Sequence, residues 1–246
     1  MSYKPFEIFK SRSQVPWVII CDHASNFVPE SIAGGDLGLN NKEMHRHIAF
    51  DVGARNLAVK LGNILDAPVI CSNFSRLIID PNRGEKDPTL VMQLYDGTII
   101  PANKNIAKKE IVRRVDLFYR PYHDAIEQIT APLENPILVS IHSFTPQLKG
   151  KKKRPWHIGL LAADDRRFHN ALLSSFGGEP GLCIGDNQPY VGKLPGDTID
   201  QHAIKKGRLN TLIEVRNNLI SNNENQKAWA EVIGKNLNQA KDLLDG

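Results

Sequence analysis

Short runs of apolar and β-branched residues recur along the chain and predict buried strands. Their length is that of strands rather than helices, and they lack the polar alternation of a strand with one face in water. Continuous apolar runs are typical of strands that are covered on both faces of a sheet. The runs lie at residues 15–22, 67–73, 76–80, 135–143, 157–162 and 210–217.

Segments with helical spacing lie between and after these strands. The first covers about 41–63, where apolar residues such as Ile48, Val52 and Leu57 recur on one helical face. Alternation of strands with helices favours an α/β fold, a mixed and largely parallel sheet with helices on both faces. The other helical segments cover about 106–130, 165–175 and 224–244.

Two long stretches rich in Gly, Pro, Asn and Asp separate the regular elements, at 84–105 and 177–207. We expect both to be loops, and loops of that length within a compact domain are usually functional. The whole chain of 246 residues is expected to form one domain, 1–246.

The composition is that of an ordinary globular protein, with 41% hydrophobic and 24% charged residues. No apolar stretch is long enough to cross a bilayer, and the first residues contain no apolar core of a secretory signal. The three cysteines are far apart and odd in number, which favours reduced thiols over a disulfide framework. We therefore expect a cytoplasmic protein with no membrane partner.

Charge gives little reason to expect a nucleic-acid partner, because the formal net charge is only +4. One dense basic run extends from Lys149 to Arg154. A solvated, mobile loop is the favoured interpretation, and a loop that attracts an anionic substrate is the alternative. A nucleic-acid patch is disfavoured, since no aromatic residues are interleaved with the basic ones.

Polar residues follow four of the predicted strands, at His23, Asp80, His142 and Glu214. Each alone has a structural explanation: a hydrogen-bonded core histidine, a turn-forming aspartate before a proline, or an ion pair of Glu214 with Arg216. Ligands of open α/β sheets, however, bind at the carboxyl ends of the strands. Two histidines and two acids at one edge would be costly to bury as structure, and they are the groups that a metal hydrolase needs.

The two histidines predict a divalent metal site, and zinc is the ion we expect. His23 and His142 offer neutral imidazoles, and catalytic zinc takes three protein ligands. Asn26, three residues after His23, is the first candidate for the third ligand. A neutral amide is a poorer zinc ligand than a carboxylate, so Asp22 and His47 are the alternatives.

The remaining polar residues suggest roles around that metal. Asp80, or else Asp22, is a candidate for the carboxylate that accepts the other ring N–H of a ligating histidine and so fixes its tautomer. Glu214 is the candidate general base, which takes a proton from water and passes it to the leaving amine. Arg83 is expected to bind a substrate carboxylate through a bidentate fork, with Asn82 donating beside it.

Two further arginines are candidates for substrate contacts. Arg76, and Arg216 if it lies nearby, would suit a substrate with one or two carboxylates, although either is equally a partner for a protein carboxylate. We therefore expect a small acidic N-acyl amino acid as the substrate.

Two other histidines have less certain positions. His47 and Asp51 are at positions i and i+4 of the predicted helix. They are interpreted as a pair that supports the site, as substrate contacts or as a surface salt bridge. His202 lies in the second long stretch together with Tyr190, where a merely exposed loop histidine is the favoured interpretation.

The order of these residues resembles two related families. An H-x-x-N segment at His23, D-x-N-R at Asp80 and S-I-H-S around His142 are similar to the site of zinc carboxypeptidase A-like enzymes. A fuller set of motifs resembles the N-formylglutamate amidohydrolase family. These motifs are C-D-H-A-S-N at 21–26, H-I-A-F-D-V-G-A at 47–54, S-R-L-I-I-D-P-N-R at 75–83, S-I-H-S-F-T-P at 140–146 and L-I-E-V-R-N at 212–217.

The resemblance implies hydrolysis of the formamide bond of N-formyl-L-glutamate, or of a related N-acyl amino acid. A peptidase or amidase that acts on a peptide or a cell-wall fragment is a second possibility. A metal-free binding protein on the same scaffold is a third, kept open by Asn26. The sequence does not indicate an oligomeric state.

Overall fold

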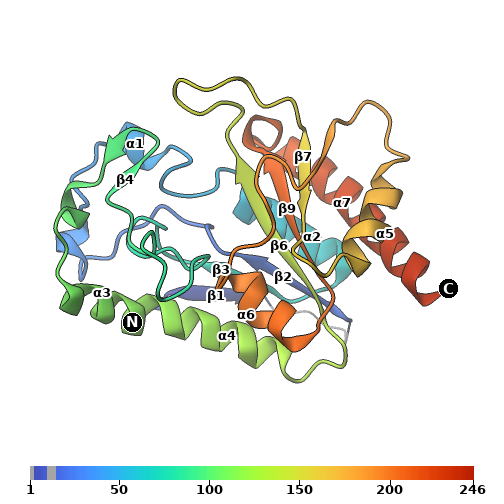
Figure 1. The fold of residues 1–246 in the computed structure, drawn as a ribbon, viewed down its shortest axis with the longest axis horizontal. Coiled ribbons are helices and arrows are strands. Elements are labelled where there is room, and N and C mark those ends of the chain that lie inside the picture. The colour runs from blue at the N-terminus through green and yellow to red at the C-terminus, as the bar shows by residue number, and fades with distance from the viewer. Residues whose placement is uncertain (1–2, 10–14) are drawn as a thin grey trace.

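A mixed seven-stranded sheet forms the centre of the protein (Figure 1). The computed structural model describes residues 3–9 and 15–246. The strand order is β1-β3-β2-β6-β9-β7-β8, in which only the pairs β1–β3 and β7–β9 are antiparallel. The predicted fold class is thus confirmed. The strands are β1 (Phe6–Phe9), β2 (Trp17–Cys21), β3 (Val69–Ser72), β6 (Ile137–Phe144), β7 (Ile158–Leu161), β8 (Ile184–Asp186) and β9 (Asn210–Arg216).

Helices cover both faces of the sheet (Figure 1). One face packs against α2 (Ala54–Leu65), α5 (Arg167–Phe176) and α7 (Asn223–Asp245), and the other against α4 (Arg120–Thr130) and α6 (Thr198–His202). The helix predicted at 106–130 is α3 (Lys108–Arg114), a π-helical segment η3 (Val115–Tyr119) and α4 in succession. None of the described helices has the length and apolar character needed to span a membrane.

The helix predicted over about 41–63 is interrupted, which corrects the sequence interpretation. Only α1 (Asn41–Met44) and α2 are helical there, and residues 45–53 form turns and a loop. Gly53 has a φ of 84°, and a Cβ at this position would lie 2.4 Å from the carbonyl oxygen of Ile220. Gly53 therefore directly precedes α2 in a left-handed conformation that suits glycine, at a point where no side chain would fit.

The prediction of a strand at 76–80 is also wrong. These residues form a turn, and Leu77, Ile78 and Ile79 are buried in a separate hydrophobic cluster with Phe74 and Phe118. An apolar run indicates that its residues are buried. Residues buried outside the sheet give the same sequence pattern as a central strand.

The two long stretches predicted as loops contain short elements of their own. The first carries the hairpin β4 (Leu94–Tyr95) and β5 (Thr98–Ile99), and the second carries β8 and α6. Short 3-10 segments complete the chain: η1 (Ala33–Gly35), η2 (Pro101–Asn103), η4 (Ile204–Lys206) and η5 (Asn217–Leu219).

Strand alternation brings the polar residues to one face of the sheet. In β6, Val139 and Ile141 belong to the core beneath α2, α5 and α7, so His142 points to the opposite face. In β9, Ile213 and Val215 likewise leave Glu214 on the side of α4 and α6. The parallel register of β6 and β9 sets His142 directly opposite Glu214.

Candidate metal centre and its pocket

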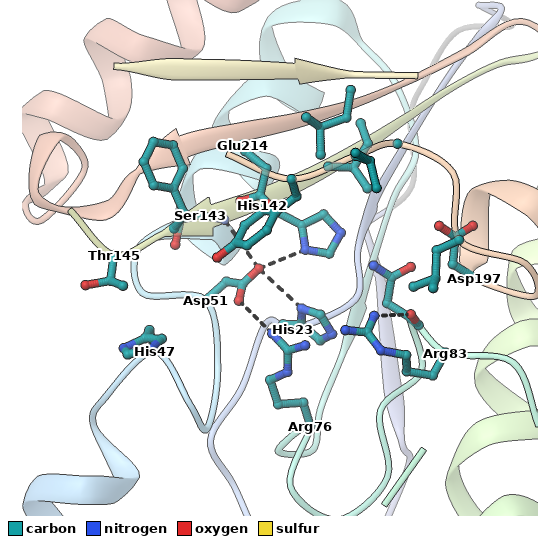
Figure 2. Close-up of a pocket in the computed structure, with 18 of the residues that line it drawn as sticks. His23, His47, Asp51, Arg76, Arg83, His142, Ser143, Thr145, Asp197 and Glu214 are labelled. Carbon is teal, nitrogen blue, oxygen red and sulfur yellow. Dashed lines mark hydrogen bonds and ion pairs between the residues drawn. The ribbon is translucent and has the colours of Figure 1, made fainter. Parts of the chain in front are cut away.

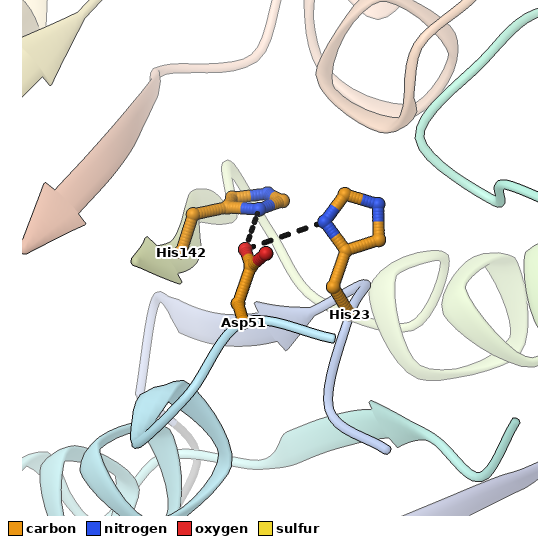
Figure 3. Close-up of side chains that lie close together, drawn as sticks. All are labelled: His23, Asp51 and His142. Atoms are coloured by element: carbon orange, nitrogen blue, oxygen red, sulfur yellow. Dashed lines mark hydrogen bonds and ion pairs between the residues drawn. The ribbon is translucent and has the colours of Figure 1, made fainter. Parts of the chain in front are cut away.

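His23, Asp51 and His142 form a compact buried cluster (Figure 3). The Nδ1 atoms of His23 and His142 lie 3.3 Å and 2.8 Å from the same oxygen, Asp51 Oδ2. One ligand atom of each residue lies within 4.8 Å of the other two. The two imidazole rings meet nearly edge to face, with centroids 4.9 Å apart.

The loop that interrupts the predicted helix positions Asp51. Its backbone N–H donates to the carbonyl oxygen of His23, and its own carbonyl oxygen accepts from Ala54 N–H at the start of α2. On the other side, Ser143 donates its N–H to Asp51 Oδ2 and its hydroxyl to the carbonyl oxygen of Val52. The loop is therefore held between the ends of β2 and β6.

A carboxylate contacts the outer nitrogen of each histidine. His23 Nε2 lies 2.7 Å from Asp80 Oδ1, and His142 Nε2 lies 3.3 Å from Asp22 Oδ2 and 3.0 Å from Ser140 Oγ. Both candidates from the sequence thus contact a histidine, one each. The Nδ1 atoms, which face Asp51, are left for a metal.

Charges within the cluster hold its carboxylates ionised despite burial. Burial alone would raise the pKa of Asp80, but Arg76, with Nη2 2.7 Å from Asp80 Oδ2, holds it well below its usual range. Burial would likewise raise the pKa of Asp51, and His23 and His142 reverse that effect. For His142, burial opposes the charged form, yet hydrogen bonds to Asp22 and Asp51 raise its pKa well above the usual value. A divalent cation would therefore compete with a proton at this histidine.

Glu214 faces the cluster without a fixed partner. It is buried, and within residues 3–9 and 15–246 no hydrogen-bond partner contacts its Oε2. Burial raises the pKa of this carboxyl to about 7. An orphaned buried carboxyl oxygen is costly as structure, and a pKa near neutrality suits proton transfer.

The cluster lies in a pocket of about 280 Å³ (Figure 2). Pockets for small molecules begin at roughly 300 Å³, so this one suits a small substrate. Figure 2 shows Arg83 and Asp197 on one side of His23, and Thr145 and His47 on the other. Burial raises the pKa of Asp197 to about 7. Asn82 also lines the pocket, and so do apolar and aromatic side chains: Tyr95, Phe144, Leu161, Tyr190, Val191, Leu194 and Leu212.

Two of the predicted site residues lie elsewhere. The Asn26 side-chain nitrogen donates to the carbonyl oxygen of Met44, and Asn26 does not line the pocket; Asp51 occupies the third position beside the histidines. Arg216 follows Glu214 by two residues in a strand but donates to the carbonyl oxygens of Arg154 and Pro155, outside this pocket. It forms no ion pair with Glu214 among the contacts of the described residues.

Arg76 and Arg83 differ in what surrounds them. Arg76 lines the pocket, but its guanidinium contacts Asp80 and, at 3.4 Å, Asp51. Arg83 has neutral partners, the carbonyl oxygen of Asn82 and the hydroxyl of Thr89. Arg83 therefore remains available for an anion, whereas Arg76 already neutralises the carboxylates around the cluster.

The structure also gives the positions of His47 and His202. His47 is not on a helix with Asp51; it lines the pocket, with Nε2 3.5 Å from Asp96 Oδ2. His202 is not exposed but buried in α6, where it contacts His123. In the basic run, the three lysines at 151–153 are exposed, and Arg154 lies over the rings of Phe144 and Tyr190.

The residues present fit a catalytic divalent metal. Two imidazoles and one carboxylate are a known ligand set of hydrolytic zinc, and ligating histidines normally donate their other N–H to a carboxylate, as the positions of Asp80 and Asp22 allow. Sequence reasoning placed Asp51 on a helix with His47, as a pair supporting the site, as substrate contacts or as a surface salt bridge, and did not consider it as a metal ligand. Its signal was nevertheless present, because Asp51 belongs to the motif at 47–54 and Gly53 two residues later argues against a continuous helix.

Comparisons with known proteins show the family. The N-formylglutamate amidohydrolase family matches residues 15–221, so the chain belongs to this family of amidohydrolases. A comparison with curated proteins gave no match.

Solved structures share the fold over nearly the whole chain. The gene product Atu2144 of Agrobacterium tumefaciens is 30% identical, with a TM-score of 0.93 over 99% of this chain and 97% of that one. The N-formylglutamate amidohydrolase of Ralstonia eutropha JMP134 is 19% identical, with a TM-score of 0.76 over 98% and 99%. A bacteriophage poly-gamma-glutamate hydrolase is 12% identical, with a TM-score of 0.52 over 100% and 92%.

Proposed function

We propose that this protein hydrolyses the amide bond of a small N-acyl amino acid, such as N-formyl-L-glutamate, in a metal-dependent reaction. The observation that carries the proposal is the position of Glu214, a buried carboxyl with an orphaned oxygen beside the His23–Asp51–His142 cluster. The family supports the reaction type, and the small pocket favours an acyl amino acid over a peptide or a cell-wall fragment.

His23, His142 and Asp51 would hold the metal, and zinc is the ion we propose. When bound, such an ion supplies Lewis acidity, which polarises a carbonyl oxygen and makes water a stronger acid. Asp80 and Asp22 fix the imidazole orientation through Nε2, so that both Nδ1 atoms stay directed at Asp51. Arg76 acts indirectly, by keeping Asp80 ionised and by contacting Asp51.

Glu214 is the proposed general base. Its free Oε2 accepts a proton from the attacking water and delivers it to the nitrogen of the leaving amino acid. The register of β9 with β6 places the Glu214 carboxyl beside His142 and therefore beside the cluster. Glu214 would thus take the proton next to the amide bond that is hydrolysed.

Arg83 is the proposed carboxylate clamp. No carboxylate of the described residues is in ion-pair contact with it, and its planar guanidinium matches a carboxylate in a two-bond fork. Asn82 lines the same side of the pocket, although its side-chain oxygen accepts from Thr198 N–H, so its amide nitrogen is the group left to donate.

The test is release of free amino acid from N-acyl amino acids by the zinc-loaded, full-length protein. Removal of the metal with a chelator should abolish release, and added zinc should restore it. Glu214→Gln should retain one equivalent of zinc but lose roughly 100- to 10,000-fold in kcat, the usual contribution of general acid–base catalysis. Unchanged turnover in Glu214→Gln would contradict the role of Glu214. Failure to retain zinc in the unaltered protein would favour a metal-free binding protein.

A further inference from the structure

Asp197 is a buried carboxyl on the wall of the pocket, and the mechanism proposed above gives it no part. The residue is only 4% exposed, and it lines the pocket. Its Oδ1 accepts from the backbone N–H of Asp200 at 2.7 Å and so caps the start of α6. Among the contacts of the described residues, its Oδ2 has no hydrogen-bond partner. One oxygen of this carboxyl is therefore free to accept a hydrogen bond inside the pocket.

The next residue, Thr198, holds Asp197 near the cluster. The Thr198 hydroxyl donates to Asp22 Oδ1 at 2.8 Å, and the other oxygen of Asp22 contacts a histidine of the cluster. The backbone N–H of Thr198 donates to Asn82 Oδ1 at 3.2 Å. Figure 2 shows Asp197 on the Arg83 side of the cluster. The free acceptor thus lies on the side of the pocket where the substrate carboxylate is proposed to bind.

The polar groups on this side complement an N-acyl amino acid. Arg83 and the amide nitrogen of Asn82 are donors, which suit a carboxylate. Asp197 Oδ2 is an acceptor, which suits a hydrogen on nitrogen. In an N-acyl amino acid a single carbon separates the carboxylate from the amide N–H. Donors for the carboxylate and an acceptor for the N–H must therefore lie on the same side of a pocket that binds both.

Capping of α6 accounts for only one of the two oxygens of Asp197. A serine or an asparagine would cap the helix as well, because either supplies the single acceptor that a cap needs. Burial raises the pKa of this carboxyl to about 7, and no arginine, lysine or histidine of the described residues forms an ion pair with it. A buried acceptor without a partner is costly as structure, so a hydrogen supplied by the substrate is the better explanation of Oδ2.

We propose that Asp197 accepts a hydrogen bond from the N–H of the amide that is hydrolysed and keeps this contact as the nitrogen leaves. This inference rests on the proposed amidohydrolase function and adds the residue that selects secondary amides. Once the amine has become an ammonium, it also supplies the positive charge that the buried carboxylate lacks.

The same contact orients the nitrogen for proton transfer. Figure 2 shows Asp197 and Glu214 on different sides of the His142 ring. A nitrogen whose hydrogen points to Asp197 turns its developing lone pair away from that residue, toward the side from which Glu214 delivers the proton. Asp197 itself transfers no proton. One water is consumed, the C–N bond breaks, and the nitrogen receives the proton that Glu214 took from the water.

The first test compares substrates with and without the N–H. The zinc-loaded protein is given N-formyl-L-glutamate and N-acetyl-L-glutamate, each beside its N-methyl counterpart, which has no amide hydrogen. We expect kcat/KM for the secondary amides to exceed that for the N-methyl amides by roughly 100-fold or more. Equal rates within a pair would overturn the inference and leave the amidohydrolase function standing. Hydrolysis of none of the four compounds would overturn both.

Variants of Asp197 assign this preference to its carboxyl. In Asp197→Asn the one oxygen stays in the cap, so an NH2 group faces the pocket, and the near-identical shape leaves the space for the N-methyl group unchanged. Asp197→Ser keeps a capping oxygen and removes the pocket oxygen. In both variants the ratio of secondary-amide to N-methyl kcat/KM should fall roughly tenfold or more, the usual worth of a hydrogen bond to a charged group.

The matched control is Asp200→Asn, in the same helix. Asp200 does not line the pocket, and its carboxyl contacts Lys205 and the N–H of Gly196. This variant should keep the ratio of the unaltered protein. A purely structural role of Asp197 would slow both members of a substrate pair alike, so an unchanged ratio in Asp197→Asn and Asp197→Ser would overturn the inference.

Discussion

Two pairs of buried histidines lie in this protein, and their surroundings differ. His23 and His142 are contacted by three buried carboxylates, Asp22, Asp51 and Asp80. His123 and His202 are stacked, with ring planes 13° apart and a 2.9 Å contact between Nδ1 of His123 and Nε2 of His202. In the second pair, Nε2 of His123 contacts the carbonyl oxygen of Pro81, and the one carboxylate in contact is that of the partly exposed Glu127, 3.4 Å from Nδ1 of His202.

The difference shows that partners, more than burial, decide what a histidine pair can do. The bond to Pro81 requires a proton on Nε2 of His123, so its Nδ1 accepts from His202 and every polar atom of that ring is used. Burial, and next the neighbouring His202, lower the pKa of His123 to about 4. In the first pair the carboxylates stabilise positive charge, which is the environment a divalent cation requires.

The largest expected contrast is in metal binding. His142→Gln should lose stoichiometric zinc and roughly a thousandfold in kcat/KM, since Lewis-acid stabilisation of the transition state is worth several kcal/mol. His123→Gln makes the same chemical change in the stacked pair and should keep one equivalent of zinc with less than a tenfold loss. Metal analysis after gel filtration, together with amino acid release, measures both. Equal zinc loss in the two variants would remove the distinction between the pairs.

A smaller contrast concerns the carboxylates behind the histidines. Asp22→Asn keeps an oxygen for the hydroxyls of Tyr122 and Thr198 but removes the charge next to His142 Nε2. We expect zinc affinity to fall 10- to 100-fold, the usual effect of removing such a partner. Competition with a chromogenic chelator measures the affinity. The matched control is Asp186→Asn, which changes the partner of His169 outside the pocket and should leave zinc affinity as it was.

Much of this organisation is predictable from sequence, because strands and site residues depend on local patterns. The runs around His142 and Glu214 predict strands, and the structure has β6 and β9 there with both side chains on one face. The pairing of Asp80 with His23 follows the same logic, since a ligating histidine needs an outer carboxylate.

The errors come from interactions that link distant parts of the chain. Asp51 reaches the histidines only because residues 45–53 leave the helix and bond to the ends of β2 and β6. Asn26 turns away because the carbonyl oxygen of Met44 is nearby in space, eighteen positions along the chain. Arg216 lies two residues after Glu214, so strand geometry predicts that both side chains lie on the same face of the sheet. The strand ends at Arg216, however, and its side chain donates to the carbonyl oxygens of Arg154 and Pro155.

The smallest expected contrast is in the pH dependence of stability. Since the pKa of His123 is lowered to about 4, the unfolded chain binds a proton below about pH 6.5 that the folded protein does not bind until about pH 4. The contribution of neutral His123 to the free energy of unfolding is therefore fully present above about pH 6.5. As the pH falls toward 4, the free energy of unfolding decreases by on the order of 1–3 kcal/mol. Urea unfolding of the metal-free protein at pH 7.0, 6.0 and 5.0 measures the slope, and His123→Gln should make it shallower. Because His142 titrates identically in both metal-free proteins, the difference isolates the stacked pair, and parallel slopes would mean that His123 is protonated in the fold.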